Sequence, residues 1–176
     1  VSTPLRDDDS VTFNLAGQSV NRVVAIIGLR TLIMLTEEAE WIISGNASGI
    51  ITPGEINPVQ QSANGAADLH PLLIGSEVLY VQARGTVVHS LGFDFSTDGY
   101  KGDDITLFAT HLFKGRTIVD WAYSKIPDST VWVVLSDGAL LGLTYIKSQQ
   151  LWGWHHHDTA ASGKFEATCC VSENKE

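Results

Sequence analysis

The residues with the clearest chemical potential lie near the end of the chain, in the run Trp152-Gly-Trp-His-His-His157. If this run is a strand, His155 and His157 share one face, because side chains alternate along a strand. Two imidazoles at this spacing are a workable start to a zinc site, which needs a third protein ligand. That ligand would have to come from elsewhere in the chain, with His89, His111 and Asp158 as the candidates. Without a companion motif the pair is a weak signal, so we favour histidines that line a rim and predict no metal and no cofactor.

Four aspartates could serve a hydrolase, because paired carboxylates carry out glycoside hydrolysis. Asp120, Asp128, Asp137 and Asp158 lie at expected turns or strand ends. Aspartates at turns usually accept local backbone hydrogen bonds, and we favour that interpretation. The chain has no Gly-x-Ser-x-Gly, no phosphate-binding glycine loop before a helix and no Cys-x-x-Cys. We therefore predict that the protein is not an enzyme.

Tryptophan is the other residue type that could support binding. Trp41, Trp121 and Trp132, with several tyrosines, could form a sugar-binding platform, although packing in a core explains them equally well. Large aromatic side chains also dominate protein interfaces. We take Trp41, Trp121 and Trp154 as candidate interaction anchors.

Composition restricts the class of protein. The 176 residues suffice for a core of ordinary size, and 44% of them are apolar and 18% charged, as in folded proteins generally. The formal net charge of −9 argues against a protein that grips nucleic acid by neutralising phosphates, though DNA could slide past such a surface. No apolar run approaches the ~20 residues that cross a bilayer. The chain begins at Val1, so we expect an excised piece of a longer polypeptide.

The elements that must position these residues are expected to be short antiparallel strands. Apolar, β-branched and aromatic runs alternate with turn residues, above all between residues 116 and 171. Ser136-Asp137-Gly138 marks a hairpin there, because Gly138 can take the positive φ of a tight turn. One short helix is expected near residues 103–113, with Asp103 or Asp104 as its N-cap. The runs expected as strands are Val11–Leu15, Arg22–Ile27, Thr31–Leu35, Glu40–Ile43, Leu72–Ile74, Val78–Val81, Thr86–Phe95, Ile118–Tyr123, Val131–Leu135, Leu140–Ile146, Leu151–His157 and Phe165–Val171.

Three further segments carry expectations of their own. Residues 1–10 are polar and rich in aspartate, and we expect a flexible arm. Residues 45–70 resemble one long loop, marked by Asn57-Pro58, that crosses between sheets or meets a partner. Cys169 and Cys170 should point to opposite faces of the last strand as buried or half-buried thiols.

The expected strands fall into three similar groups, at residues 11–45, 70–95 and 116–171. Each group contains an apolar strand, a polar turn and a second apolar strand. Repeats of about 40–50 residues that each form a small antiparallel sheet are typical of β-propeller blades. We therefore predict an all-β, mainly antiparallel fold with one short helix, as a single domain over residues 11–176 made of about three blade-like units. A β-sandwich is the alternative, and three blades form only an incomplete propeller.

The sequence of this chain also resembles those of a family of long proteins of tailed bacteriophages and prophages. The resemblance covers about residues 10 to 171 and rests on structural motifs, none of them catalytic. The residues that carry it are Leu35-Thr36, Glu40-Trp41, Ile51-Thr-Pro-Gly54, Gln61-Ser-Ala-Asn-Gly65, Pro71-Leu-Leu-Ile-Gly75, Val78-Leu-Tyr-Val-Gln82, Gly99-Tyr100, Asp104-Ile-Thr-Leu107, His111-Leu-Phe113, Val131-Trp132, Asp137-Gly138, Leu143-Thr-Tyr145 and Trp154 with His157-Asp-Thr159. The chain is similar to an internal or near C-terminal portion of the nozzle-type tail tube components of short-tailed phages, which are β-propeller proteins.

This resemblance implies a structural protein of the virion tail that acts by subunit assembly, gates a channel and lets DNA pass on ejection. Its partners would be other copies of itself and neighbouring phage tail proteins, with DNA only as passing cargo and no membrane segment. It would lie in the virion tail, and in the host cytoplasm during assembly, with the 45–70 loop as a candidate for contacts between subunits. The alternatives are a carbohydrate-binding or glycan-cleaving β-propeller at the host surface and a generic protein-interaction propeller.

Overall fold

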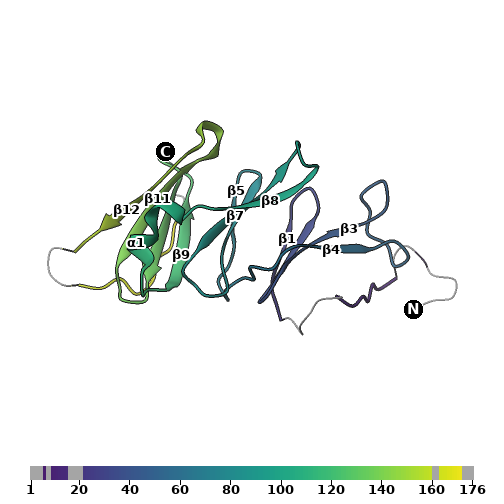
Figure 1. The fold of residues 1–176 in the computed structure, drawn as a ribbon, viewed down its shortest axis with the longest axis horizontal. Helices are drawn as coiled ribbons and strands as arrows, with labels where there is room; N and C mark the ends of the chain where they lie inside the picture. The colour runs from purple at the N-terminus through teal and green to yellow at the C-terminus, as the bar shows by residue number, and fades with distance from the viewer. Residues whose placement is uncertain (1–5, 7–8, 16–21, 160–162, 172–176) are drawn as a thin grey trace. The chain divides into compact units, whose positions relative to one another are not determined.

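The computed structural model describes residues 6, 9–15, 22–159 and 163–171. The chain divides into two compact units, residues 1–68 and 69–176. The strands among the described residues form three four-stranded sheets (Figure 1), and all neighbouring strands pair antiparallel, in the order in which they follow along the chain. The predicted mainly antiparallel β fold is confirmed. The single domain expected over residues 11–176 stays a prediction.

The first unit contains one sheet, built from runs of β-branched and other apolar residues that favour a pleated, half-buried surface. Glu37-Glu38 supplies a polar turn between two of these runs. The Thr36 hydroxyl closes this turn, because it donates to the Ala39 carbonyl (2.7 Å) and accepts from the Ala39 N–H (3.1 Å). The strands of the sheet are β1 (Val23–Gly28), β2 (Leu32–Thr36), β3 (Glu40–Ser44) and β4 (Asn57–Ser62).

A hydrophobic cluster centred on Trp41 covers one face of this sheet. Trp41 lies opposite Met34 in the register of β2 and β3, so the two side chains meet on the same face. The buried members of the cluster are Met34, Ala39, Trp41 and Ile43, and the half-buried side chains packed against them are Phe13, Leu15, Leu32, Ile51 and Ile56.

Two predictions for the first unit are wrong. Residues 11–15 form no strand, because Phe13 and Leu15 contribute apolar side chains to the cluster while their backbone stays outside the sheet. The long loop expected over residues 45–70 contains β4, which includes Pro58. β4 is an edge strand, where a proline without an N–H is tolerated. Most of the arm expected at residues 1–10 lies outside the described residues.

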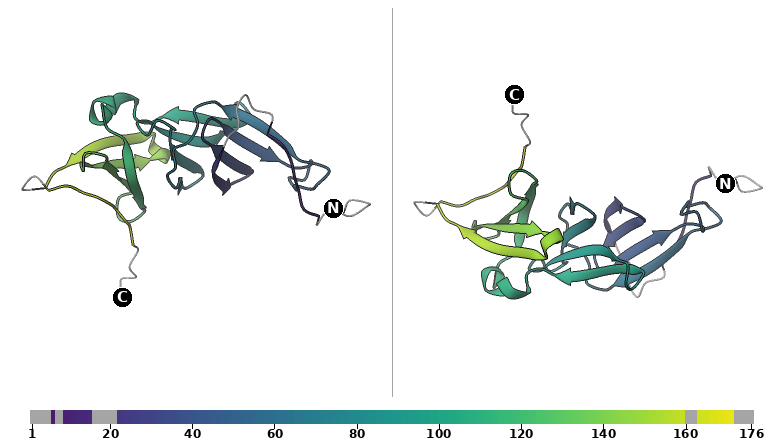
Figure 2. Two further views of the ribbon diagram at one scale, coloured as in Figure 1. Left: turned by 90° about the horizontal axis from the view of Figure 1, so that it is seen from below. Right: turned by 90° about the horizontal axis from the view of Figure 1, so that it is seen from above.

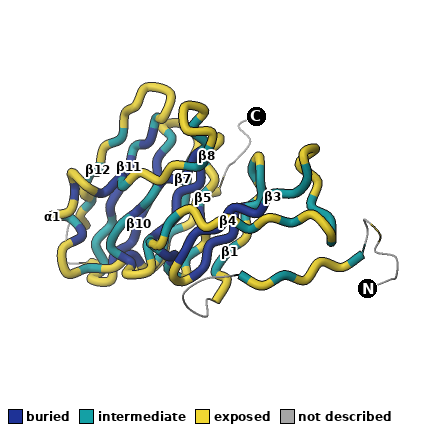
Figure 3. The backbone as a smooth tube through the Cα atoms, turned by 45° about the vertical axis from the view of Figure 1, so that its right-hand side comes forward, coloured by how far each residue is buried: buried dark blue, intermediate teal, exposed yellow. Residues whose placement is uncertain are grey.

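The second unit begins with a sheet whose central strands are buried, shown dark blue in Figure 3. All five residues of β6 are buried, so both of its faces are covered. β8 was not among the predicted strands, because its sequence Gly-Tyr-Lys-Gly-Asp-Asp is polar and it lies at the sheet edge. The strands are β5 (Leu72–Ile74), β6 (Glu77–Val81), β7 (Val88–Asp94) and β8 (Gly99–Asp104).

The expected short helix is present but begins later than predicted. Helical turns cover Leu107–Ala109, in 3-10 geometry, and α1 (Thr110–Phe113). The Asp104 carboxylate accepts hydrogen bonds from the Thr106 N–H (2.7 Å) and hydroxyl (2.6 Å), so it closes a turn before the helix rather than capping it. The helical segment lies beside the last sheet (Figure 2), where the Phe113 ring meets Trp154 edge to face with 4.9 Å between centroids.

The last sheet has two distinct faces. We call the face that carries Val133, Leu141 and Leu143 the inner face, and all three are fully buried. The opposite, outer face carries half-buried polar and aromatic side chains. The predicted hairpin is confirmed, because Gly138 takes a φ of 86° and its N–H donates to the Leu135 carbonyl (2.8 Å). The strands are β9 (Ile118–Ser124), β10 (Thr130–Leu135), β11 (Leu140–Ile146) and β12 (Leu151–His157), with a 3-10 turn at Lys147–Gln149.

The strand predicted at Phe165–Val171 is wrong, because the described residues 163–171 form an irregular segment along the last sheet. The Thr168 N–H donates to the Asp120 carboxylate (2.7 Å), so a side chain takes the donor that a strand ladder would use. Cys169 and Cys170 lie in this segment and are exposed, not buried as predicted. Partial burial, and then the neighbouring Cys169 thiolate, raise the pKa of the Cys170 thiol above its usual range.

Two indole hydrogen bonds join the inner face of the last sheet to the residues that flank β5–β8. Trp121 Nε1 donates to the His70 carbonyl (2.7 Å), just before β5. Trp154 Nε1 donates to the Ile105 carbonyl (2.8 Å), directly after β8. Each bond satisfies the indole N–H, the one polar group of a tryptophan side chain, at a place where the two sheets pack together.

A buried acid forms the third polar contact between these two sheets. Tyr145 is 2% exposed and its hydroxyl donates to a Glu77 carboxylate oxygen (2.5 Å). The second carboxylate oxygen pairs with Lys147 Nζ (2.9 Å), so the charge of Glu77 is compensated. Burial, together with the hydrogen bond and negative charge of Glu77, raises the pKa of Tyr145 well above its usual range.

Candidate functional site

The three tryptophans considered as interaction anchors are packed within their own units. Trp41 and Trp121 are 3% and 6% exposed. Trp154, which belongs to β12, is half-buried against Phe113 of the helical segment. Core packing accounts for all three positions. A direct role of these side chains in binding a partner stays a prediction.

His155 and His157, which we call the imidazole pair, lie together on the outer face of the last sheet, as their spacing predicts. His155 Nδ1 is 2.7 Å from His157 Nε2, and the ring centroids are 4.8 Å apart. Trp132 packs against both rings, with centroid distances of 4.9 Å to His157 and 6.1 Å to His155. The indole therefore helps to hold the two imidazoles in place on the sheet.

The position of His155 depends on a glycine in the neighbouring strand. Gly142 lies directly between Trp132 on β10 and His155 on β12 in the sheet register. A Cβ atom on Gly142 would lie 2.1 Å from the imidazole Cε1 of His155, which is far inside contact distance. The His155 ring can lie over β11 only because residue 142 has no side chain.

Polar surroundings orient His155 further. Its Nε2 lies 3.4 Å from the Thr144 hydroxyl, while its Nδ1 faces His157. Burial, and then the positive charge of a protonated His157, lower the pKa of His155 below its usual range. His155 is therefore neutral near pH 7, with one ring nitrogen free of a proton.

The sequence-derived candidates for a third metal ligand do not join the pair. His89 stacks on Tyr80 in the preceding sheet, with 5.5 Å between centroids, and His111 lies in α1. Asp158 instead pairs with His156, whose Nδ1 is 3.3 Å from the carboxylate. Within the described part of the chain, no three or more His, Cys, Asp or Glu side chains gather in a way that could hold a metal ion.

An open pocket of about 650 Å³ borders His155, one member of the imidazole pair. Trp132, Thr144 and His155 form one side of it, and the residues of the β9–β10 turn form the other. Sequence analysis gave Trp132 a possible role in binding sugars but missed Gly142 and Thr144. The position of Gly142 inside the apolar run Leu140–Tyr145 was the only sequence feature that could have drawn attention to it. Its role depends on how β10, β11 and β12 are aligned.

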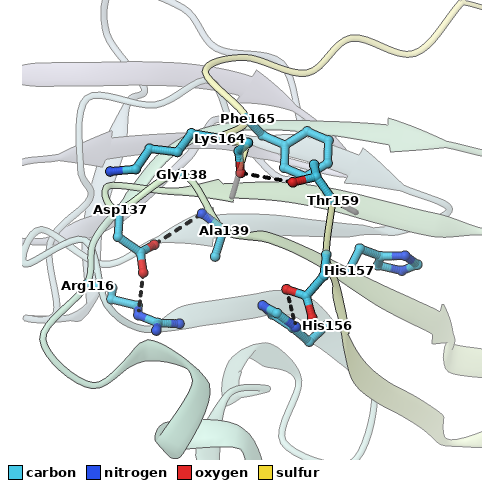
Figure 4. A pocket seen from close by; sticks show the side chains of 11 residues that line it. Arg116, Asp137, Gly138, Ala139, His156, His157, Thr159, Lys164 and Phe165 are labelled. Atoms are coloured by element: carbon cyan, nitrogen blue, oxygen red, sulfur yellow. Dashed lines mark hydrogen bonds and ion pairs between the residues drawn. The ribbon is translucent and has the colours of Figure 1, made fainter. Parts of the chain in front are cut away.

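A second pocket, of about 510 Å³, lies at the end of the same sheet and is bordered by charged residues (Figure 4). Arg116 Nε donates to the Asp137 carboxylate (2.9 Å), which also accepts the Ala139 N–H (3.2 Å). At its rim His156 Nδ1 lies 3.3 Å from the Asp158 carboxylate. The two contacts of Asp137 hold the β10–β11 hairpin, as the turn interpretation of Asp137 predicts.

Comparison of the sequence with models of known protein families gives no match, and comparison with curated proteins gives no significant match. Among the residues that the structure describes, no helix is long and apolar enough to cross a bilayer.

Proposed function

We propose that this chain is a structural module of a bacteriophage tail, built of propeller-like blades, that acts by assembly in a conduit for DNA and not by catalysis. The observation that carries the proposal is the repetition of one unit: three consecutive sheets of four antiparallel strands, each paired in chain order. Four-stranded sheets repeated along a chain are the building pattern of propeller proteins.

Packing between sheets supports a rigid structural role. In the second unit, β6 is buried on both faces, and the sheets β5–β8 and β9–β12 meet through the buried Tyr145–Glu77 hydrogen bond, to which the half-exposed Lys147 adds its charge. Polar groups that are fully satisfied at a buried contact fix one arrangement of the packed elements. A wall that must keep its shape while DNA moves past it needs such fixed contacts.

Charge and sequence resemblance support the phage setting. The formal net charge of −9 would repel the phosphates of passing DNA and so prevent it from sticking to the wall. The resemblance to nozzle-type tail tube components spans nearly the whole chain. We propose other copies of the protein and neighbouring tail proteins as its partners, and the virion tail as its location.

The test is the assembly state of the full-length protein. Light scattering gives its absolute mass in solution, and electron microscopy gives the shape of the particles. We expect rings with a central channel. A strict monomer at high concentration, for the full-length protein and for this chain, would overturn the proposal.

A carbohydrate-binding propeller is the second candidate, and one observation favours it. Trp132 lies half-buried beside the open pocket of about 650 Å³, with the Thr144 hydroxyl next to it, and sugar rings commonly stack on such indoles. This function predicts glycan binding that is lost in Trp132→Ala and kept in Trp152→Ala, which changes the inner face of the same sheet. A glycan array without binding would remove it.

A further inference from the structure

We propose that the imidazole pair, His155 and His157, is a binding site for a divalent late transition metal, with Cu²⁺ and Ni²⁺ preferred over Zn²⁺. Two ring nitrogens face each other on the outer face, at a separation of 2.7 Å. Imidazole nitrogen is a favoured ligand of copper, nickel and zinc. The site is independent of the phage proposal.

The nitrogen separation distinguishes among metals. With metal–nitrogen distances of about 2.0 Å, two ligands at a right angle lie about 2.8 Å apart, and two tetrahedral ligands about 3.3 Å apart. The observed 2.7 Å matches the spacing at the right angle of a square-planar or octahedral ion, so the two nitrogens need not move apart, and each ring turns to direct its lone pair at the ion. Tetragonal geometry is typical of Cu²⁺ and Ni²⁺, and the general order of affinity also places Cu²⁺ above Zn²⁺.

The surroundings prepare His155 for this role. With the Thr144 hydroxyl accepting from His155 Nε2–H, the free lone pair of His155 lies on Nδ1, toward His157. In the metal-free pair, His157 Nε2–H donates to that lone pair. Metal binding then needs only a shift of the His157 proton from Nε2 to Nδ1, which leaves both rings neutral and both facing nitrogens free to bind.

The protein also restricts how the rings can move. Trp132 packs against both imidazoles, and the absence of a side chain at Gly142 lets the His155 ring lie over β11. A pair held in place before binding loses less conformational entropy when the metal arrives. Two protein ligands leave the other coordination positions open, and the adjoining pocket gives water access to His155.

The experiment is a titration of the metal-free protein with Cu²⁺ and Ni²⁺ at about pH 7.5, where histidine is mostly neutral. Calorimetry measures stoichiometry and affinity, and electron paramagnetic resonance counts the nitrogens bound to Cu²⁺. We expect one Cu²⁺ per chain bound by two imidazole nitrogens, and weaker binding of Zn²⁺.

Three variants separate this site from adventitious binding. The double variant His155→Ala, His157→Ala should lose the two-nitrogen signal. His156→Ala is the matched control, because its side chain lies on the opposite face of the same strand, and it should keep the signal. Thr144→Val removes the group that orients His155 and should weaken Cu²⁺ binding by about tenfold. A two-nitrogen signal that survives the double variant, or that His156→Ala removes, would overturn the proposal.

A measurement on the unchanged protein covers the case in which the double variant does not fold. Substoichiometric Cu²⁺ broadens the nuclear magnetic resonance signals of protons close to it. The imidazole signals of His155 and His157 should broaden first, ahead of those of His70, His89 and His111. Equal broadening of all histidines, or none, would refute a site at the imidazole pair.

Discussion

Removing one hydroxyl tests the buried contact between the two sheets of the second unit. In Tyr145→Phe the ring stays, and the hydrogen bond to the Glu77 carboxylate (2.5 Å) is lost. A hydrogen bond to a charged group contributes about 1.5–3 kcal/mol to stability. Lys147 still compensates the charge of Glu77, so we expect the free energy of unfolding to fall by about 2 kcal/mol, within that range. Urea denaturation followed by circular dichroism and tryptophan fluorescence measures the change.

The pH dependence of stability gives a second readout of the same contact. The pKa of Tyr145 is raised in the folded state above the value of about 10 for an exposed tyrosine. Above about pH 10 the unfolded chain therefore loses the proton that the folded chain retains, and the contribution of Tyr145 to stability declines as pH rises. Below about pH 10 that contribution is fully present. The stability of the wild type should fall more steeply above this pH than that of Tyr145→Phe.

Tyr123→Phe is the matched control. The Tyr123 hydroxyl is 3.1 Å from the hydroxyl of Ser129, a neutral partner, at a half-buried position of the same sheet. Its removal should cost only about 0.5–1 kcal/mol. The reasoning is refuted if Tyr145→Phe costs no more than Tyr123→Phe, or if the slopes above pH 10 are the same in the wild type and Tyr145→Phe.

Three further outcomes are expected. Gly142→Ala places a methyl group 2.1 Å from Cε1 of the His155 ring and should destabilise the protein by about 1–3 kcal/mol, measured by urea denaturation. Adding His155→Ala should restore most of the lost free energy of unfolding. A double variant no more stable than Gly142→Ala would show that the overlap with the His155 ring is not the cause. Trp121→Ala removes a buried ring and its hydrogen bond and should cost about 3–5 kcal/mol in the same assay, whereas a loss below about 0.5 kcal/mol would place this residue outside the core. Cys169 and Cys170 should both react with a thiol reagent without denaturant, with Cys170 reacting more slowly near neutral pH because its pKa is raised and the thiolate is the nucleophile; two unreactive thiols would contradict their exposure.

Among the described residues, the sequence predicted all six central strands and four of the six edge strands, and the two strands that it missed, β4 and β8, both lie at sheet edges. Central strands such as β6 and β10 are buried, and burial requires the apolar, β-branched residues by which a strand is recognised. β4 and β8 each pair with one neighbour through backbone hydrogen bonds, and such pairing at an edge does not require apolar side chains. Their sequences, Asn-Pro-Val-Gln-Gln-Ser and Gly-Tyr-Lys-Gly-Asp-Asp, are therefore polar and did not indicate a strand. The converse error occurred at 165–171, where an apolar pattern is present but the segment forms no ladder.

The same distinction applies to the candidate site. Strand periodicity alone placed His155 and His157 on one face, because their spacing within β12 is local. The roles of Trp132, Gly142 and Thr144 depend on how three strands are aligned with one another, and a single sequence carries no direct record of that alignment.

The three polar contacts between the sheets of the second unit have a mechanical consequence. The hydrophobic effect between two apolar faces has no preferred direction. Hydrogen bonds weaken steeply when their angle changes. The contacts from Trp121, Trp154 and Tyr145 reach partners at three separate places along the neighbouring sheet, so a lateral force would load all three at once. The two sheets would therefore resist lateral displacement together. Under increasing force, we expect the three contacts to break in one cooperative step and not one after another.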